Sequence, residues 1–122
     1  MSAEENIQIA QNCYAAFGRG DIAGILDAVD ENTVWVTPDI GLPPGGVYHG
    51  KAGVAQFFQQ VGETWEFQGF EPKQFIASGD QVVVLGSYAF TSRSTGRSGS
   101  SEWAMAWTIR DGRVVHFQEY AD

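Results

Sequence analysis

The sequence predicts an α+β fold in which helices cover one face of an antiparallel sheet. Three observations support this prediction. Apolar residues recur at helical spacing in the first half of the chain, and they alternate at strand spacing in the second half. Short Gly-containing turns separate the alternating segments. Because no repeat, linker or change of composition interrupts the 122 residues, we expect a single domain over residues 1–122.

The first half of the chain carries three predicted helices. Residues 4–17 place a single apolar stripe on one helix face, and two glycines soon after it favour a stop. Asp21 can cap a second, short helix over 22–29. The third helix is predicted over 51–60, after a Pro/Gly-rich loop that occupies 39–50.

The strands are predicted from β-branched and aromatic residues and from their turns. The segment TVWVTP, residues 33–38, reads as a short strand that Pro38 stops. Asp111-Gly112 is a strong two-residue hairpin signal. The strands that follow the third helix are predicted at 63–68, 71–78, 81–92, 101–110 and 113–121.

The last predicted strand puts an acid on an apolar face. Val115, Phe117 and Glu119 alternate with the residues between them, so their side chains share one side of the sheet. Either that side of the sheet is exposed to solvent near Glu119, or Glu119 lies in a pocket. His116 falls on the opposite side and is interpreted as structural or interfacial.

Tryptophans give this small chain a large apolar area to bury. Trp103, Met105 and Trp107 share one face of their strand, and Trp35 and Thr37 share a face of theirs. These two sets of side chains either form a solid core or line a cavity. We expect Trp35 and Trp103 on the wall of such a cavity.

Composition narrows the partners and the compartment. Seven Lys+Arg against fifteen Asp+Glu leave a net charge of −8, which disfavours nucleic acid and anionic membranes. The acidic start lacks the features of a signal peptide and no apolar run has membrane-spanning length, so we expect a cytoplasmic protein. One cysteine, Cys13, and two histidines without ligand spacing predict no disulfide and no metal site. We expect no cofactor.

Four segments carry a family resemblance: CYAAFGRGDIAGILDAVDENTVWVTP, YHGKAGVAQFF, GDQVVVLGSY and EWAMAWTIRDGRVVHFQEYAD. In this order they resemble the nuclear transport factor 2-like superfamily, and its SnoaL-like (ketosteroid isomerase-like) branch most closely. The resemblance implies a cone-shaped α+β barrel, in which three N-terminal helices wrap a curved antiparallel sheet around an apolar cavity. It also implies a homodimer through the outer sheet face. It does not imply one reaction, because this fold hosts enzymes, binding modules and transport adaptors.

Ketosteroid isomerase chemistry is not expected. The resemblance would put a general-base Asp at Thr37, an oxyanion-hole Tyr at Cys13 and a protonated Asp at Met105, and none of these is present. That mechanism needs a base and two hydrogen-bond donors at a developing enolate. Tyr14 is not expected to replace the tyrosine, because neighbouring helix positions point about 100° apart.

Two other reactions of the branch match in part. In limonene epoxide hydrolases, Glu119 would fall on one of two acids, while Gly86 and Tyr88 stand where an Arg and the other acid belong. Trp35 and Thr37 replace a Tyr and an Asn that hold the water. SnoaL-type cyclases need one acidic acid–base group in an apolar pocket, and Glu119 can be that group. Gly86 would leave room for a ligand.

Glu119 is therefore the candidate catalytic residue. Burial among aromatic side chains would raise its pKa and suit it to proton transfer near neutral pH. The alternative is a structural acid bonded to a hydroxyl or a backbone amide. The candidate ligand-binding residues are Trp35, Thr37, Tyr48, His49, Tyr88, Trp103, Met105 and Phe117.

Three functions stay open at this point. The first is a small cofactor-free enzyme, an isomerase, cyclase or hydrolase. It would act through Glu119 on a small apolar carbonyl or hydroxyl compound, which can be cyclic. The second is a small-molecule-binding module without chemistry, because Thr37, Gly86 and Met105 are inert where relatives carry reactive groups. The third is a subunit that dimerises through its outer sheet face and adapts other proteins.

Overall fold

The computed structural model describes residues 2–38 and 44–121. None of the helices in these ranges is long and apolar enough to cross a membrane. In chain order the elements are α1 (Ala3–Gly18), α2 (Ile22–Ala28), β1 (Val29–Thr37), β2 (Gly46–His49), α3 (Gly50–Thr64), β3 (Trp65–Ser78), β4 (Gln81–Ser92), β5 (Ser98–Arg110) and β6 (Arg113–Ala121).

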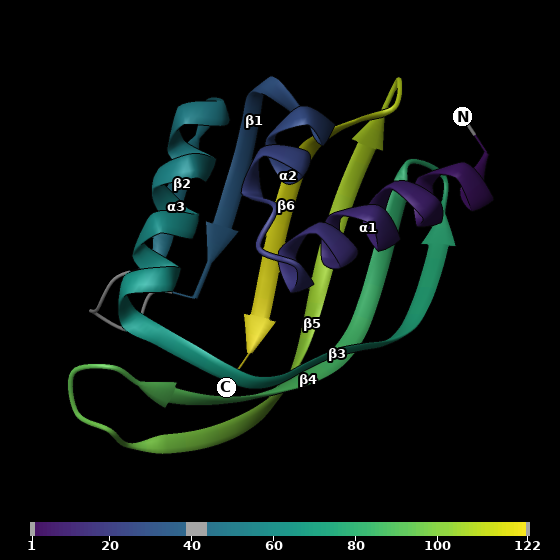
Figure 1. The fold of residues 1–122 in the computed structure, drawn as a ribbon. Coiled ribbons are helices and arrows are strands. Elements are labelled where there is room, and N and C mark those ends of the chain that lie inside the picture. Colours follow the sequence, from purple (N-terminus) through teal and green to yellow (C-terminus); the bar gives the residue numbers. More distant parts are fainter. Residues whose placement is uncertain (1, 39–43, 122) are drawn as a thin grey trace.

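The strands form one curved sheet in the order β2-β1-β6-β5-β4-β3, and the three helices lie against one of its faces (Figure 1). This confirms the predicted α+β class with the helices on one face. Neighbouring strands are antiparallel except β1 and β6, which are parallel. The sheet is therefore mixed and not antiparallel throughout. After β1 the chain crosses through α3 to the far edge and returns as a meander, so β6 arrives beside β1 in the same direction.

Local capping fixes the start of both N-terminal helices. Ser2 and Glu5 form a capping box at α1, each side chain accepting from the other residue's backbone N–H at 3.1 Å. Asp21 caps α2 as predicted, and its Oδ1 accepts from the Gly24 N–H at 2.9 Å. The inward stripe of α1 consists of Asn6, Ala10, Cys13 and Ala16, all buried.

The segment between β1 and β3 differs from the prediction. Residues 39–43 of the predicted loop lie outside the described residues, and Gly46–His49 at its other end form the edge strand β2. The third helix runs to Thr64, beyond the predicted end at residue 60. Val61 continues its buried stripe, so apolar burial extends the helix by another turn.

The two strands predicted at 63–68 and 71–78 are one edge strand, β3. Its pairing with β4 shifts register twice, between Phe67 and Gly69 and between Pro72 and Gln74. Each shift interrupts the simple alternation that strand prediction relies on. Pro72 is tolerated because an edge strand leaves one side of its backbone without a partner.

A bulge near the start of β6 changes which valine is buried. Val114 is fully buried and takes the core position that alternation assigned to Val115. Beyond the bulge the prediction holds, and Phe117 and Glu119 lie on the face that the helices cover.

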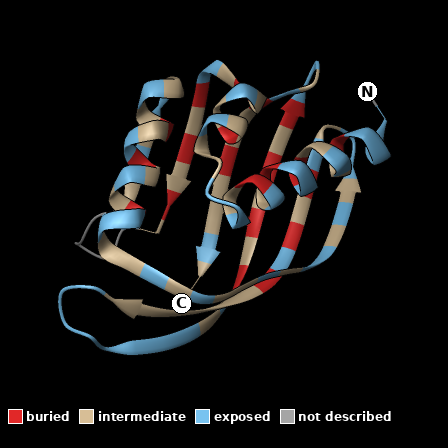
Figure 2. Ribbon diagram, in the orientation of Figure 1, coloured by how far each residue is buried: buried red, intermediate tan, exposed pale blue. Residues whose placement is uncertain are grey.

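Aromatic rings fill the space between the helices and the sheet. Trp35 on β1 stacks on Phe117 of β6, with centroids 3.9 Å apart and planes 19° apart. The ring of Trp107 meets both of them edge-on, at 5.7 and 4.8 Å. Buried residues gather on the strands behind the helices, whereas the far end of the β4–β5 hairpin is exposed (Figure 2).

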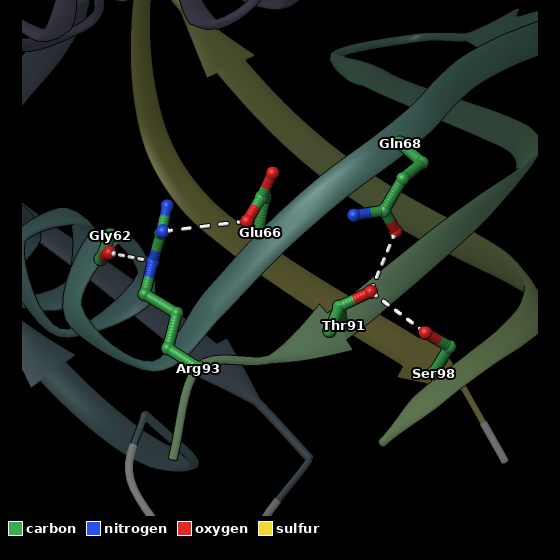
Figure 3. Close-up of polar contacts among 6 residues, drawn as sticks. All are labelled: Gly62, Glu66, Gln68, Thr91, Arg93 and Ser98. Carbon is green, nitrogen blue, oxygen red and sulfur yellow. Dashed lines mark hydrogen bonds and ion pairs between the residues drawn. The ribbon is translucent and has the colours of Figure 1, made fainter. Parts of the chain in front are cut away.

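Polar contacts tie that exposed hairpin end to the end of α3 (Figure 3). Arg93 Nε donates to the carbonyl oxygen of Gly62 at 2.8 Å, and its Nη1 lies 3.7 Å from Glu66 Oε2. Thr91 Oγ1 donates to Gln68 Oε1 at 3.1 Å. An exposed ion pair contributes little by itself. The bond to Gly62 satisfies a carbonyl in the last turn of the helix, and so fixes where the hairpin meets it.

Gly86 of β4 has no room for a side chain. A Cβ atom there would overlap the carbonyl oxygen of Glu71 and the indole ring of Trp103. The space that we expected Gly86 to leave for a ligand is therefore occupied by Trp103, and that expectation is wrong.

We predict that Gly86→Ala lowers the free energy of unfolding by about 1–3 kcal/mol, the usual cost of overpacking. Urea denaturation followed by circular dichroism measures it. Gly62→Ala in α3 is the matched control, because a Cβ there meets nothing within 4 Å. Alanine favours helix, so the control is expected to be neutral or stabilising by up to about 1 kcal/mol. Equal effects of the two substitutions would contradict the packing described here.

Candidate functional site

A cavity of about 330 Å³ lies between the concave face of the sheet and the helices. Aromatic side chains from α1, α3, β1 and β3 to β6 form most of its wall. The volume lies at the lower end of the range of small-molecule sites, which are roughly 300–1,000 Å³. Such a wall favours a compact ligand with flat apolar surfaces.

Glu119 is the only carboxylate on the cavity wall among the described residues. It lies on β6, where its sheet neighbour is Met105 of β5. The hydroxyl of Tyr88, on β4, donates to Glu119 Oε2 at 3.1 Å. Burial raises the pKa of the Glu119 carboxyl, and the hydrogen bond from Tyr88 opposes that rise. The site thus holds one carboxyl group whose proton comes off at a higher pH than usual.

The pKa of Tyr88 is raised by burial, by the charge of Glu119 and by its bond to that carboxylate. Tyr88 is therefore a fixed donor and not a base. Thr37, at the end of β1, donates its hydroxyl to the carbonyl oxygen of Pro44 at 3.0 Å. Its hydroxyl proton is already used within the protein.

Tyr14 reaches the cavity from α1, contrary to the expectation that it turns away. Its hydroxyl accepts from Trp107 Nε1 at 2.9 Å and donates to Met105 Sδ at 3.1 Å. Cys13 lies on the cavity wall as well. Two consecutive helix positions therefore line one cavity, and α1 lies across one face of the curved sheet (Figure 1).

Six of the predicted site residues line the cavity: Trp35, Thr37, Tyr88, Met105, Phe117 and Glu119. Their positions agree with the predicted wall. Their roles toward a ligand stay predictions.

Three predicted ligand-binding residues do not line this cavity. Trp103 is buried behind the wall, in the space beside Gly86, and contributes only to a shallow depression next to Glu119. Tyr48 lies on β2 and donates its hydroxyl to Gln60 Oε1 at 2.6 Å. His49 is exposed at the N-terminus of α3. Both residues belong to the edge strand β2, whose last residue is also the N-cap of α3.

Other wall residues were not predicted, notably Tyr14, Phe17, Phe67 and Phe70. A signal for the first two was present, because both belong to the apolar stripe of the predicted helix 4–17. No alternation pattern could place Phe67 and Phe70 together, since residues three apart point to opposite faces of a regular strand. The register shift between them turns both rings inward.

The cysteine and the acidic residues offer no further reactive centre in the described part of the chain. Cys13 is buried, and burial raises the pKa of its thiol to about 11, so it stays neutral and unreactive at pH 7. Across residues 2–38 and 44–121, no group of three or more His, Cys, Asp and Glu side chains is arranged to hold a metal ion.

Solved structures of other proteins share this architecture over nearly the whole chain. An NTF2-like protein from Burkholderia xenovorans is 36% identical, with 100% of this chain and 92% of that chain covered and a TM-score of 0.91. An NTF2-like protein of unknown function from Burkholderia pseudomallei is 35% identical, with the same coverage and a TM-score of 0.88. TerC, co-crystallised with polyporic acid, is 32% identical, with 97% and 92% covered and a TM-score of 0.85.

No curated protein matches the sequence. The family model of the SnoaL-like domain matches residues 10–117, which include Tyr14 and end two residues before Glu119. The chain belongs to the SnoaL-like family and has the NTF2-like fold.

Proposed function

We propose that this protein binds a small, largely apolar aromatic compound in the cavity and that Glu119 exchanges a proton with it. The observation that carries the proposal is a single carboxyl group buried in an aromatic wall and held by Tyr88. Tyr88 orients the carboxyl group, and the wall orients the ligand.

The aromatic wall supports a flat ligand. Ring faces from several elements surround the space, and stacked or edge-on contacts with them favour an aromatic guest. A ligand that fills the cavity also displaces water, which strengthens the polar contact with Glu119.

Glu119 supports proton transfer because it can serve in both protonation states. Tyr88 uses one of about four acceptor positions of the carboxylate, which leaves others for a ligand hydroxyl. The protonated form can instead donate to a ligand carbonyl. Its raised pKa brings the two forms closer in population near neutral pH. An isomerisation, a ring closure or a hydrolysis can each begin with such a step.

The likeness to TerC suggests a first compound to test. That protein was co-crystallised with polyporic acid, and it is 32% identical over 97% of this chain. Polyporic acid is therefore the starting probe for the cavity.

A second candidate is a binding module without chemistry. The hydroxyl of Thr37 donates to the carbonyl oxygen of Pro44, and the ring of Trp103 covers Gly86. Met105 supplies only a thioether. These are positions at which the resemblance would put reactive groups. In the described part of the chain, Tyr88 is the only residue that forms a hydrogen bond with the side chain of Glu119.

We predict that Glu119→Gln keeps ligand binding and abolishes turnover. The amide oxygen can still accept from Tyr88, but the side chain cannot carry the proton, so we expect affinity for polyporic acid within about threefold and turnover lowered at least about 100-fold. Fluorescence titration and mass spectrometry of the incubated compound measure the two quantities. If wild-type protein binds the compound tightly and returns it unchanged, the binding-module candidate is favoured. Equal turnover by Glu119→Gln would rule out the proposed role of Glu119.

The raised pKa of Glu119 predicts a particular pH dependence of stability. Between the unfolded and the folded pKa the folded protein holds more protons, so its stability falls as pH rises through that window. Each unit of the shift costs about 1.4 kcal/mol above the folded pKa. Glu119→Gln should therefore be more stable than wild type at pH 8, and this advantage should vanish below about pH 4.

Tyr88→Phe is the companion variant. Loss of the hydroxyl removes the bond that lowers the pKa of Glu119, so the pKa should rise further. Carbon NMR of the labelled carboxyl group measures it. A pKa that is unchanged in Tyr88→Phe would contradict the hydrogen bond described here.

The outer sheet face supports a homodimer, which we also propose. Val47, Ile76, Leu85 and Tyr120 are large exposed side chains on the face opposite the helices. An isolated protomer would leave these apolar groups in water.

We predict that Leu85→Glu converts a dimer into a monomer, because it places a charge on that face, on the strand next to the β3 edge. Sedimentation velocity measures the state. Gln59→Glu adds the same charge on the exposed side of α3 and should leave the dimer intact. A wild-type protein that sediments as a monomer at every concentration would refute the dimer.

A further inference from the structure

The hydroxyl groups of the cavity wall differ in what they donate to. Four such groups occur among the described wall residues. Those of Thr37, Tyr88 and Ser101 each donate to an oxygen atom of the protein. Tyr14 alone donates to sulfur, at Met105 Sδ. A thioether is a weak acceptor. Breaking the bond from Tyr14 to sulfur therefore costs less free energy than breaking any of the three bonds to oxygen.

Tyr14 is held in place by its surroundings and not by that weak bond. Its hydroxyl oxygen accepts from Trp107 Nε1 at 2.9 Å. Its ring stacks on Trp103, with centroids 5.8 Å apart and planes 22° apart, and lies beside Phe70 at 6.2 Å. Because the oxygen already accepts one bond, the O–H proton is the group that Tyr14 offers. Burial raises the pKa of Tyr14, so it keeps this proton.

We propose that Tyr14 forms a second, oxygen-recognising subsite, in which a carbonyl oxygen of the ligand replaces Met105 Sδ as the acceptor. The inference rests on the proposed function, since it concerns the same cavity. It narrows the ligand to an aromatic carbonyl compound. An acceptor oxygen gains a full hydrogen bond there at the expense of a weak one, whereas a hydrocarbon gains nothing.

The position of the subsite adds a requirement for the rest of the ligand. Met105, which holds the Tyr14 hydroxyl, is the sheet neighbour of Glu119. A ligand whose carbonyl reaches Tyr14 therefore lies across Met105 with its next edge toward Glu119. A hydroxyl or an acidic C–H on that edge meets the proton-transfer group. The substrate class is an aromatic carbonyl compound with a second, proton-exchanging group.

The test compares 9-fluorenone, an aromatic ketone, with fluorene, which has the same rings without the oxygen. Both are titrated at pH 8 into wild-type protein and into Tyr14→Phe, with tryptophan fluorescence as the readout. We expect Tyr14→Phe to bind fluorenone roughly 3- to 10-fold more weakly and fluorene unchanged. The infrared carbonyl band of bound fluorenone should lie at lower frequency in wild type than in Tyr14→Phe, because only wild type donates to it.

Met105→Leu supplies the reciprocal measurement. It removes the sulfur and leaves the Tyr14 hydroxyl without an acceptor, so fluorenone should bind about 2- to 5-fold more tightly while fluorene stays the same. Opposite shifts in the two variants support the subsite. If Tyr14→Phe changes neither the fluorenone affinity nor the carbonyl band, the subsite is refuted, while binding of fluorene would leave the aromatic cavity standing. If wild-type protein binds neither compound, both the subsite and the proposed aromatic ligand fail.

Discussion

The stack of Trp35 on Phe117 is the contact on which the rest of the structure depends. It joins β1 to β6, the one parallel pair in the described sheet, whose ladder is interrupted between Val29 and Val34. Without a continuous ladder, the strands need their side chains to hold the register. The stacked rings do this, and they also form one side of the cavity. The same contact between Trp35 and Phe117 thus joins the two strands and shapes the cavity wall.

The site carries energetic costs that the aromatic core offsets. The indole nitrogens of Trp35 and Trp103 have no hydrogen-bond partner among the described residues, and burial disfavours the charged form of the Glu119 carboxyl group. Large buried rings supply the compensating apolar area. Filling the cavity with side chains and replacing Glu119 with an apolar residue would make the folded protein more stable. The buried carboxyl group is consequently the observation on which the proposed function rests.

Much of the fold could be predicted from the sequence, because helix stripes, caps and hairpin turns are local signals. Alternation placed Phe117 and Glu119 on one face, and the family resemblance indicated that this face lines a cavity. What failed depends on backbone irregularity and tertiary space. The bulges in β3 and β6 reassign inward positions, so Phe67 and Phe70 joined the wall unpredicted. We did not expect Tyr14 at the cavity, because neighbouring positions on a helix point about 100° apart. That argument considers the helix by itself and leaves out the sheet that packs against it.

The fit of Trp103 against Gly86 has a consequence for substitutions at position 86. A larger residue at position 86 is compatible with this sheet only if the indole at position 103 shrinks or leaves. Either change would open or reshape the floor beside Glu119. Because a Cβ at position 86 would also meet the carbonyl oxygen of Glu71, a larger residue there requires the backbone of β3 to shift as well, so three strands are coupled at this one glycine.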